Sequence, residues 1–228
     1  QFDYFRRIIR ASAGISIASE KICLVETRIS RRLSELNISS FSDYADYLGG
    51  ANQELPFFIE ALTTNLTDFF REEQHYDHLI EHCRANFSTS RINIWSAACS
   101  TGEEIYSAAL LLQRYRNENP NFDYRMLGTD IDLNVIKTAE AGIYKKEDIE
   151  TAPIDLVTKN FQVHKDGSKY RVADSIRRKI KFKRNNLNDF KDNIEMKFDI
   201  IFLRNVLIYF PTEVCDAVIT QIYRNMKV

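Results

Sequence analysis

The stretch that most constrains the fold is residues 92–106, which read Ile-Asn-Ile-Trp-Ser-Ala-Ala-Cys-Ser-Thr-Gly-Glu-Glu-Ile-Tyr. Its first four residues form a short apolar run that is typical of a buried parallel strand. Small residues follow as far as Gly102, and a helical pattern begins at Glu103. A strand, a tight loop of small residues and a helix form the opening unit of a doubly wound nucleotide-binding fold, in which small residues let a ligand approach the backbone.

The identity of that ligand does not follow from this stretch alone. Gly102 is the only glycine in the loop, so the loop is not the dinucleotide fingerprint G-x-G-x-x-G. The chain has 228 residues and is 44% hydrophobic, which is enough for one large domain or two smaller ones. A net charge of −1 gives no general reason to expect binding to nucleic acid or a membrane surface. The most apolar run, residues 198–210, is interrupted by Arg204 and Asn205, so we expect no membrane insertion.

The cysteines and histidines do not predict a metal site. The four cysteines are far apart and form no C-x-x-C pair, so we expect reduced thiols in a cytoplasmic protein. His75, His78 and His82 share one helical face and raise the possibility of zinc. No carboxylate or thiol completes a site at ligand spacing, and we therefore predict that the protein binds no metal.

The first 62 residues are expected to form a small helical module. Ser19 is a candidate N-cap for a helix with apolar residues on one face, and further helices are expected to begin near Ser42 and Leu55. The other face of the Ser19 helix carries the basic residues Arg28, Arg31 and Arg32. That face is either a solvated surface or a docking site for an acidic partner.

Residues 63–71 combine threonine and asparagine with two aromatic residues and an arginine. Thr67 or Asp68 can cap the helix that follows, and the two phenylalanines are expected to anchor a core at a domain junction. Asn65, Thr67 and Arg71 are either ordinary residues of a helix boundary or ligands of a cleft at that junction.

Polar residues follow successive predicted strands at the same edge of the sheet. Strands are expected at residues 92–95, 124–129, 180–184 and 198–203, with a small hairpin over residues 161–172 as an insertion. Asp130 follows the second strand, where an acidic residue commonly accepts hydrogen bonds from ribose hydroxyls. Each polar residue alone is an ordinary cap or turn residue, but together they predict a ligand crevice at the carboxyl ends of the strands; they are Glu103, Asp130, Asn186 and Asn205.

Four motifs carry a family resemblance. They are Thr-Thr-Asn-Leu-Thr-Asp-Phe-Phe-Arg at 63–71, Ser-Ala-Ala-Cys-Ser-Thr-Gly-Glu-Glu at 96–104, Thr-Asp-Ile-Asp at 129–132 and Arg-Asn-Val-Leu-Ile-Tyr-Phe at 204–210. In this order they resemble the CheR family of chemotaxis receptor glutamate methyltransferases, and the resemblance covers almost the whole chain. It implies an α/β protein with an N-terminal all-α helical domain, residues 1–75, and a Rossmann-like methyltransferase domain, residues 76–228, with an inserted antiparallel β-subdomain at about 150–176.

The resemblance also implies a reaction and its participants. S-adenosyl-L-methionine would donate a methyl group to glutamate side chains in the cytoplasmic domain of methyl-accepting chemotaxis receptors, and S-adenosyl-L-homocysteine would be released. Arg71 and Tyr209 would lie near the transferred methyl, and Arg28, Arg31 and Arg32 would dock acidic receptor helices. The residues implied to line the cofactor site are Asn65, Thr67, Arg71, Glu103, Asp130, Asn186, Leu187, Arg204 and Asn205, with Glu104 as the less favoured alternative to Glu103.

The chain departs from the family pattern at its end. The family sheet would continue after residues 223–228 with a glycine turn and three further strands, which this sequence lacks. We therefore expect residues 198–203 to form an unpaired apolar edge strand, and this 228-residue piece not to fold as a stable monomer. A monodisperse monomer that melts cooperatively would contradict that expectation.

The implied chemistry needs no general base. A free glutamate has a pKa near 4.3 and is already ionised at neutral pH, so the protein has to align the reactants, with Arg71 or Tyr209 orienting the acceptor carboxylate. A nucleic-acid amino-methyltransferase usually carries an Asn/Asp-Pro-Pro-Tyr tetrapeptide, whereas Arg204-Asn-Val-Leu stands here. The other alternative is a non-catalytic module that binds the cofactor or docks on receptors.

Overall fold

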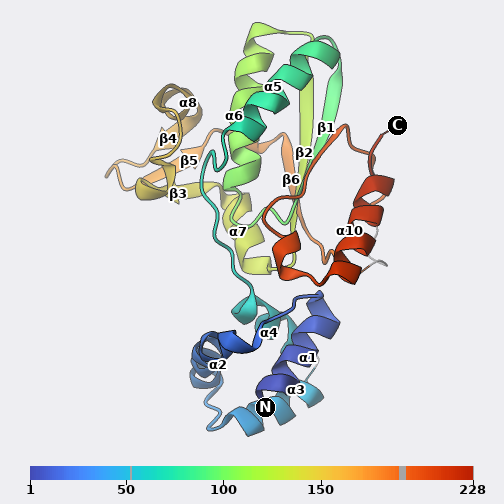
Figure 1. Cartoon of the computed structure of the whole chain (residues 1–228). Helices are drawn as coiled ribbons and strands as arrows, with labels where there is room; N and C mark the ends of the chain where they lie inside the picture. Colours follow the sequence, from blue (N-terminus) through green and yellow to red (C-terminus); the bar gives the residue numbers. More distant parts are fainter. Residues whose placement is uncertain (52, 190–193, 228) are drawn as a thin grey trace. The chain divides into compact units, whose positions relative to one another are not determined.

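The computed structural model describes residues 1–51, 53–189 and 194–227, and the chain divides into two compact units (Figure 1). The helical unit contains Gln1–Thr64, Asn186–Asn193 and Asn205–Tyr223. The sheet unit contains Asn65–Asn185, Ile194–Arg204 and Arg224–Val228. The sequence places the division at residue 75, whereas the units of the structure divide after Thr64, so residues 65–75 belong to the sheet unit.

The helical unit packs short amphipathic helices around an apolar centre. Phe5 and Ile9 of the first helix, and Val25 and Ile29 of another, follow the i, i+4 spacing that places side chains on one face, and all four are buried. Ser40 caps a helix by accepting the Asp43 backbone N–H. Its elements are α1 (Phe2–Ala13), η1 (Ser19–Lys21), α2 (Ile22–Leu36), α3 (Phe41–Gly50), α4 (Leu55–Leu62), η3 (Leu207–Tyr209) and most of α10 (Thr212–Arg224).

The sheet unit is built on four parallel strands in the order β6-β2-β1-β7. The chain steps outward from β1 to β2 to β6, and then returns to the other side of β1 as β7. This reversal is the topological switch point of a doubly wound sheet, beside which ligands bind at the carboxyl ends of the strands. The strands are β1 (Arg91–Ala97), β2 (Asp123–Asp130), β6 (Ile180–Arg184) and β7 (Ile200–Phe202).

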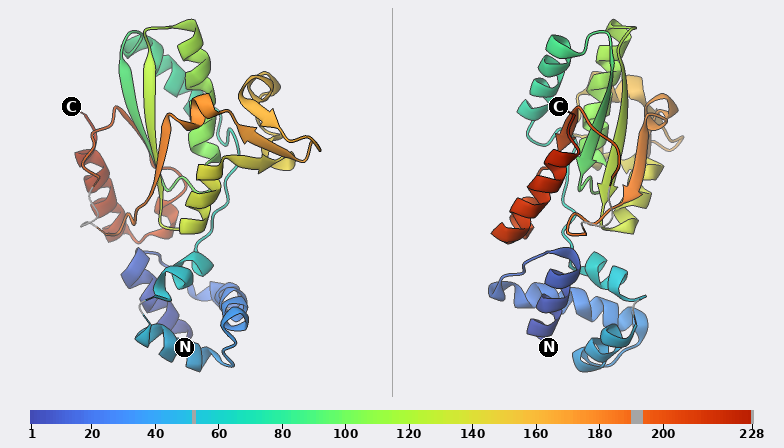
Figure 2. Two further views of the ribbon diagram at one scale, coloured as in Figure 1. Left: turned by 180° about the vertical axis from the view of Figure 1, so that it is seen from behind. Right: turned by 90° about the vertical axis from the view of Figure 1, so that its right-hand side faces the viewer.

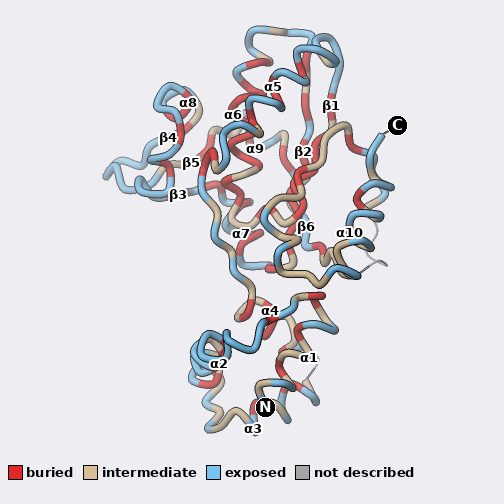
Figure 3. Tube along the Cα trace, viewed as in Figure 1, coloured by how far each residue is buried: buried red, intermediate tan, exposed pale blue. Residues whose placement is uncertain are grey.

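Helices pack against this sheet and enclose its core (Figure 2). Eleven of the sixteen residues of α6 are buried, which explains why its apolar pattern has no clear polar face. Figure 3 shows the buried residues concentrated in β1, β2 and α6. The helices are α5 (Gln74–Asn86), α6 (Glu103–Glu118), α7 (Leu133–Ala141) and α9 (Asp174–Arg177). No helix in the described part of the chain is both long and apolar enough to cross a membrane.

A second, small antiparallel sheet lies to one side of the main sheet (Figure 1). The predicted hairpin is present as β4 (Phe161–Val163) and β5 (Lys169–Val172), and it turns through Gly167 at a φ of 71°. A third strand, β3 (Ile143–Lys145), pairs with the other side of β5. Three residues are too few to show the alternation of a strand, so the sequence did not reveal β3. The 3-10 turn η2 (Glu147–Ile149) and helix α8 (Ile154–Asn160) complete this part.

The sequence predicts residues 198–203 as an unpaired edge strand, and β7 does lie at the edge of the main sheet. The prediction is wrong only at the start of this stretch, because Phe198 forms a parallel bridge with Met226. The Phe198 N–H donates to the Asn225 carbonyl at 2.8 Å, and the Lys227 N–H donates to the Phe198 carbonyl at 2.8 Å. The start of this stretch is therefore paired on the side of β7 that faces away from β1.

Candidate functional site

The loop after β1, residues 98–102, has a tightly specified backbone. Ala98, Ser100 and Gly102 have φ values of 63°, 49° and 101°, and the Cys99 N–H donates to the Thr129 carbonyl at 2.9 Å. A Cβ atom at Gly102 would lie 2.9 Å from the Tyr144 hydroxyl. The glycine thus permits a left-handed turn and the close approach of a protein side chain, whereas the sequence suggested only a ligand.

Asp130 lies at the carboxyl end of β2, as the sequence predicts, and its carboxylate joins two loops. It accepts the backbone N–H of Ser100 at 2.9 Å and that of Asp132 at 3.1 Å. Burial raises the pKa of Asp130 even though these N–H groups favour the ionised form. Each carboxylate oxygen has two lone pairs, so after these two hydrogen bonds Asp130 can still accept hydrogen bonds from ligand hydroxyls.

Asn65 is held against the same two loops. Its side-chain amide donates to Asp132 Oδ2 at 2.7 Å, and its carbonyl accepts the Ser100 hydroxyl at 3.0 Å. Asp132 also caps α7 by accepting the Asn134 N–H at 2.8 Å. Thr67, two residues along, is half-buried. The start of the 65–73 segment is thereby fixed beside the carboxyl ends of β1 and β2.

Glu103 and Glu104, the adjacent glutamates at the start of α6, contact different groups. Glu103 accepts the Thr101 hydroxyl at 2.6 Å, and burial raises its pKa to about 7. Glu104 accepts the Ser96 hydroxyl at 2.8 Å and the Arg204 guanidinium at 3.0 Å. Burial also raises the pKa of Glu104, although Ser96 and Arg204 oppose that shift. Glu104, which the sequence ranked second, is therefore the one brought to the residues that follow β7.

Arg71 is presented by a turn without glycine, residues 70–72. Phe70 and Glu72, on either side of it, have φ values of 57° and 59°. The Arg71 side chain is part-exposed and donates to the Leu66 carbonyl at 3.2 Å. The Arg71 carbonyl accepts a hydrogen bond of 2.5 Å from the guanidinium of Arg204. Arg71 and Arg204, which are both predicted site residues, are thus joined by a hydrogen bond.

The buried carboxyls show what kind of ligand fits. Burial raises the pKa of Glu103, Glu104 and Asp130, all at the carboxyl ends of β1 and β2. Raised values mean that the protein does not fully compensate for the water these groups lost. S-adenosylmethionine carries an ammonium, a sulfonium and ribose hydroxyls, and these cationic and donor groups suit an acidic, acceptor-rich edge. The residues present therefore fit this cofactor.

Four predicted site residues belong to the helical unit. The Asn186 amide donates to the Ser12 carbonyl at 2.7 Å, and its Oδ1 accepts the Asn188 N–H. Tyr209 is half-buried and its carbonyl accepts the Ser16 N–H at 2.8 Å. Leu187 lies in a turn, and Asn205 is exposed with a φ of 55°. Their roles toward the cofactor stay predictions.

The predicted docking face on α2 is partly occupied by internal contacts. Arg28 donates to the Leu62 and Thr63 carbonyls at the end of α4, at 3.0 and 2.7 Å. Arg32 makes a bidentate pair with the buried Glu54, at 2.7 and 2.8 Å. The Arg31 side chain is 85% exposed and lies 3.5 Å from the Glu35 carboxylate, one turn further along the same helix. The position of Arg28 at a helix C-terminus suits its positive charge.

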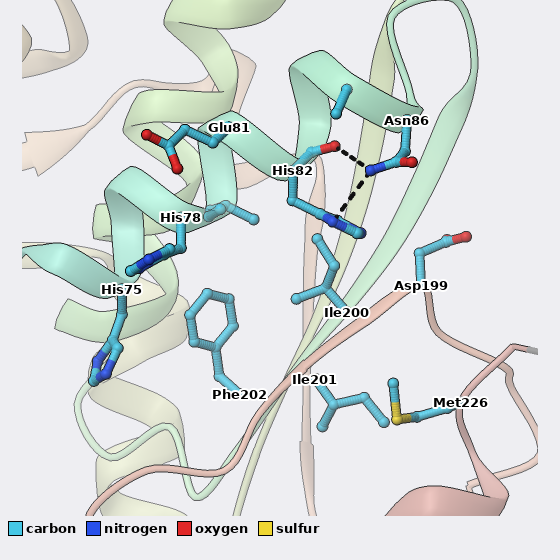
Figure 4. A pocket seen from close by; sticks show the side chains of 12 residues that line it. His75, His78, Glu81, His82, Asn86, Asp199, Ile200, Ile201, Phe202 and Met226 are labelled. Carbon is cyan, nitrogen blue, oxygen red and sulfur yellow. Dashed lines mark hydrogen bonds between the residues drawn. The ribbon is translucent and has the colours of Figure 1, made fainter.

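The histidines of α5 line a pocket beside β7 (Figure 4). His75 and His78 lie near Phe202, and His82 accepts a hydrogen bond from Asn86. None of the predicted cofactor residues lines this pocket. Across the described residues, no group of three or more histidine, cysteine or acidic side chains is arranged to hold a metal ion.

Taken together, a doubly wound parallel sheet with buried acidic residues at the carboxyl ends of β1 and β2 defines the class of Rossmann-like nucleotide-cofactor enzymes. Two family models refine this class. Residues 65–228 match "CheR methyltransferase, SAM binding domain" and residues 1–63 match "CheR methyltransferase, all-alpha domain". This chain belongs to the CheR methyltransferase family, and it is an S-adenosylmethionine-dependent methyltransferase of chemotaxis.

Curated relatives agree with this assignment. The chemotaxis protein methyltransferase 2 of Pseudomonas aeruginosa is 39% identical over 93% of this chain and 77% of its own length. The chemotaxis protein methyltransferase of Salmonella typhimurium is 38% identical over 98% of this chain and 79% of its own, and that of Borreliella burgdorferi is 36% identical over 90% and 75%. Among solved structures, a magnesium protoporphyrin IX methyltransferase from Synechocystis covers 68% of this chain and 55% of its own, with a TM-score of 0.39 and 18% identity; a likeness this distant carries no argument.

Sequence reasoning missed two serines that hold the site residues in place. Ser96 donates to Glu104 and Ser107 accepts the Phe70 N–H, so both make hydrogen bonds between different elements. One pattern in the sequence could have indicated the contact between Ser96 and Glu104. On a helix, neighbouring residues point about 100° apart, so of Glu103 and Glu104 only one can face a polar residue at the end of β1, and Ser96 is such a residue.

Proposed function

We propose that this chain methylates glutamate side-chain carboxylates in the cytoplasmic domain of methyl-accepting chemotaxis receptors, giving glutamate methyl esters and S-adenosylhomocysteine. The observation that carries the proposal is the match of residues 65–228 to a SAM-binding CheR domain, together with the acidic edge formed by Glu103 and Asp130 in the same residues. The proposal also implies a cytoplasmic location, where receptor signalling domains are accessible.

Within the sheet unit, the proposed cofactor ligands are Asn65, Thr67, Arg71, Glu103 and Asp130. Asp130 accepts hydrogen bonds from ribose hydroxyls, and the buried carboxylates provide an acidic environment for cationic groups. Asn186, Leu187 and Asn205 are proposed as further cofactor contacts from the helical unit. When bound, S-adenosylmethionine supplies an electrophilic methyl group on a sulfonium.

The chain itself has to orient the acceptor rather than activate it. A glutamate with a pKa near 4.3 is ionised at neutral pH, so no side chain needs to remove a proton. Arg71, which is part-exposed, and the phenol of Tyr209 are proposed to hold the acceptor carboxylate in line with the methyl group. Exclusion of water favours the reaction, because opposite charges on the carboxylate and the sulfonium are lost as the bond forms.

Receptor docking is proposed to depend mainly on Arg31. Arg28 and Arg32 are engaged in contacts within the helical unit, whereas Arg31 is exposed on α2. Replacing Arg31 with glutamate should raise KM for the receptor and leave the affinity for S-adenosylhomocysteine unchanged. Arg7→Glu, an equal change of charge at an exposed residue of α1, is the matched control.

The decisive experiment is the transfer of labelled methyl groups to receptor-containing membranes, with binding of S-adenosylhomocysteine measured in parallel by calorimetry. Release of the label as methanol under mild base identifies a carboxyl methyl ester. Label that resists base would contradict O-methylation. Binding without transfer to receptors would instead indicate the non-catalytic module. Arg71→Ala and Tyr209→Phe should each reduce transfer, and full activity of both variants would refute their assigned roles.

A further inference from the structure

The turn at residues 70–72 needs support from outside itself. Phe70 and Glu72 both adopt the left-handed conformation, with φ values of 57° and 59°, although neither is glycine. Such conformations are unfavourable for residues with a Cβ atom, and they persist only where the surrounding structure holds them. Arg71 lies between them, so whatever holds the turn also sets the direction of Arg71.

Three side chains from other elements hold this turn and the residue before it. The Thr151 hydroxyl donates to the Phe69 carbonyl at 2.8 Å, and the Ser107 hydroxyl accepts the Phe70 N–H at 2.9 Å. Arg204 donates to the Arg71 carbonyl at 2.5 Å and pairs with the Glu72 carboxylate at 3.4 Å. Of the three, Arg204 alone contacts both Arg71 and Glu72.

Most of the N–H donors of the Arg204 guanidinium are directed at protein groups. Its Nη1 also faces Glu104 at 3.0 Å and the Tyr76 hydroxyl at 3.3 Å, and the group lies over the Tyr76 ring at 5.5 Å from the centroid. Its Nε is buried and has no hydrogen-bond partner within the described residues. A guanidinium has five N–H donors, so four of them are directed at protein groups and the fifth is inaccessible to a ligand.

We propose that Arg204 is a positioning residue rather than a cofactor ligand: it clamps the left-handed turn at residues 70–72 and thereby aims Arg71. Glu104 is the fixed anchor of the clamp, because Ser96 at the end of β1 holds it in turn. This inference rests on the proposed function only for the consequence to turnover. The clamp itself is a property of the ligand-free protein.

The first test replaces Arg204 with lysine. A lysine can still pair with Glu104, but it lacks the fork needed to bond the Arg71 carbonyl at the same time. In Arg204→Lys we expect faster hydrogen exchange in the peptide that contains Phe70 and Arg71, measured without ligand by mass spectrometry. Arg177→Lys is the matched control, because Arg177 also donates to a carboxylate, Asp174, and to a backbone carbonyl, that of Glu140.

A second variant keeps the test possible if Arg204→Lys does not fold. If Arg204→Lys does not give a cooperative thermal transition, Glu72→Gln weakens the same clamp from the other side. We expect it to speed exchange in the same peptide, but by less than Arg204→Lys would. Unchanged exchange at the turn in a folded Arg204→Lys or Glu72→Gln protein would overturn the clamp.

A double-mutant cycle tests whether Arg204 acts through Arg71. We expect Arg204→Lys to lower kcat about tenfold to a hundredfold, with a smaller change in KM for S-adenosylmethionine, because misplacement of an aligning group mainly affects turnover. In an Arg71→Ala background the same change should have little further effect, within about threefold. Two independent losses that multiply would instead mark Arg204 as a cofactor ligand and overturn the inference.

Failure of the inference and failure of the proposed function are distinguishable. If the wild-type chain neither binds S-adenosylhomocysteine by calorimetry nor transfers methyl groups, the proposed function fails, and the exchange experiment still decides the clamp. If the wild-type chain binds and transfers, but the Arg71–Arg204 cycle is additive, the proposed function stands and the positioning role is wrong.

Discussion

Two neighbouring turns of the sheet unit both hold non-glycine residues in the left-handed conformation, but different contacts stabilise them. The β1 loop, residues 98–102, has three left-handed positions, and backbone hydrogen bonds to the end of β2 and a glycine hold it in place. The Arg71 turn, residues 70–72, has two such positions and no glycine, and it depends on hydroxyl and guanidinium groups from distant parts of the chain. The first turn includes a glycine and a backbone-to-backbone hydrogen bond, which no side-chain truncation removes, whereas the second relies on side chains that single substitutions can remove.

The largest effect is expected in the β1 loop at Gly102. Gly102→Ala forces a Cβ atom into a φ of 101° and to within 2.9 Å of the Tyr144 hydroxyl and 3.0 Å of the Ala139 Cβ. We expect a loss of about 2–4 kcal/mol in the free energy of unfolding, measured by urea denaturation. Gly167→Ala is the control, since Gly167 has a φ of 71° but no other group of the described residues lies within 4 Å of the position that its Cβ atom would take. Equal losses at the two glycines would show that conformation alone, and not the close approach, makes Gly102 necessary.

The β1 loop should also respond to pH through Glu103. Because burial raises its pKa from 4.5 to about 7, the folded state binds more protons than the unfolded state between these values. The contribution of Glu103 to stability is therefore full below pH 4.5 and is lost as pH rises through 7. Relative to Glu103→Gln, which stays neutral, the wild type should lose at most about 3 kcal/mol of unfolding free energy between pH 4.5 and pH 8.

Urea denaturation of both proteins at several pH values measures this difference. The wild-type and Glu103→Gln curves should converge in acid, diverge between pH 4.5 and pH 7, and keep a constant separation above pH 7. A difference between them that does not vary with pH would mean that Glu103 has the same pKa in the folded and the unfolded protein.

A smaller effect is expected in the Arg71 turn at Ser107. Ser107→Ala removes the acceptor of the buried Phe70 N–H, and an unpaired buried donor should cost about 1–3 kcal/mol. Ser34→Ala is a close control, because both hydroxyls donate to the carbonyl four residues earlier but Ser34 is exposed. If the two substitutions cost the same, Ser107 does not stabilise the turn.

The smallest effect is expected at Thr151, which holds the residue before the turn. Thr151→Val removes a hydrogen bond to the Phe69 carbonyl and keeps the shape of the side chain. We expect a loss of about 0.5–1.5 kcal/mol by urea denaturation, against almost none for Thr158→Val on the exposed face of α8. A cost above that of Ser107→Ala would reverse the order of importance that we assign to these anchors.

The contrast between the two turns also explains which of their features could be predicted from the sequence. The strand, loop and helix around Gly102 are encoded by residues next to each other in sequence, so apolar runs and small residues reveal them. Asp130 was likewise found because it directly follows a strand. The Arg71 turn was noticed from its motif, but its left-handed backbone and its anchors were not, since Ser107 and Arg204 come from 36 and 133 positions further along the chain.

The sequence by itself determined the order of the elements, the acidic edge of a doubly wound sheet and the family. Periodicity and turn residues act locally, and the family motifs are read without knowledge of contacts. Only the tertiary structure decided that Glu104 rather than Glu103 meets Arg204, and that Arg28 and Arg32 are engaged within the helical unit while Arg31 remains exposed. The physical reason is that the direction of a side chain and the identity of its partners depend on how separate segments pack, and chain spacing does not contain that information.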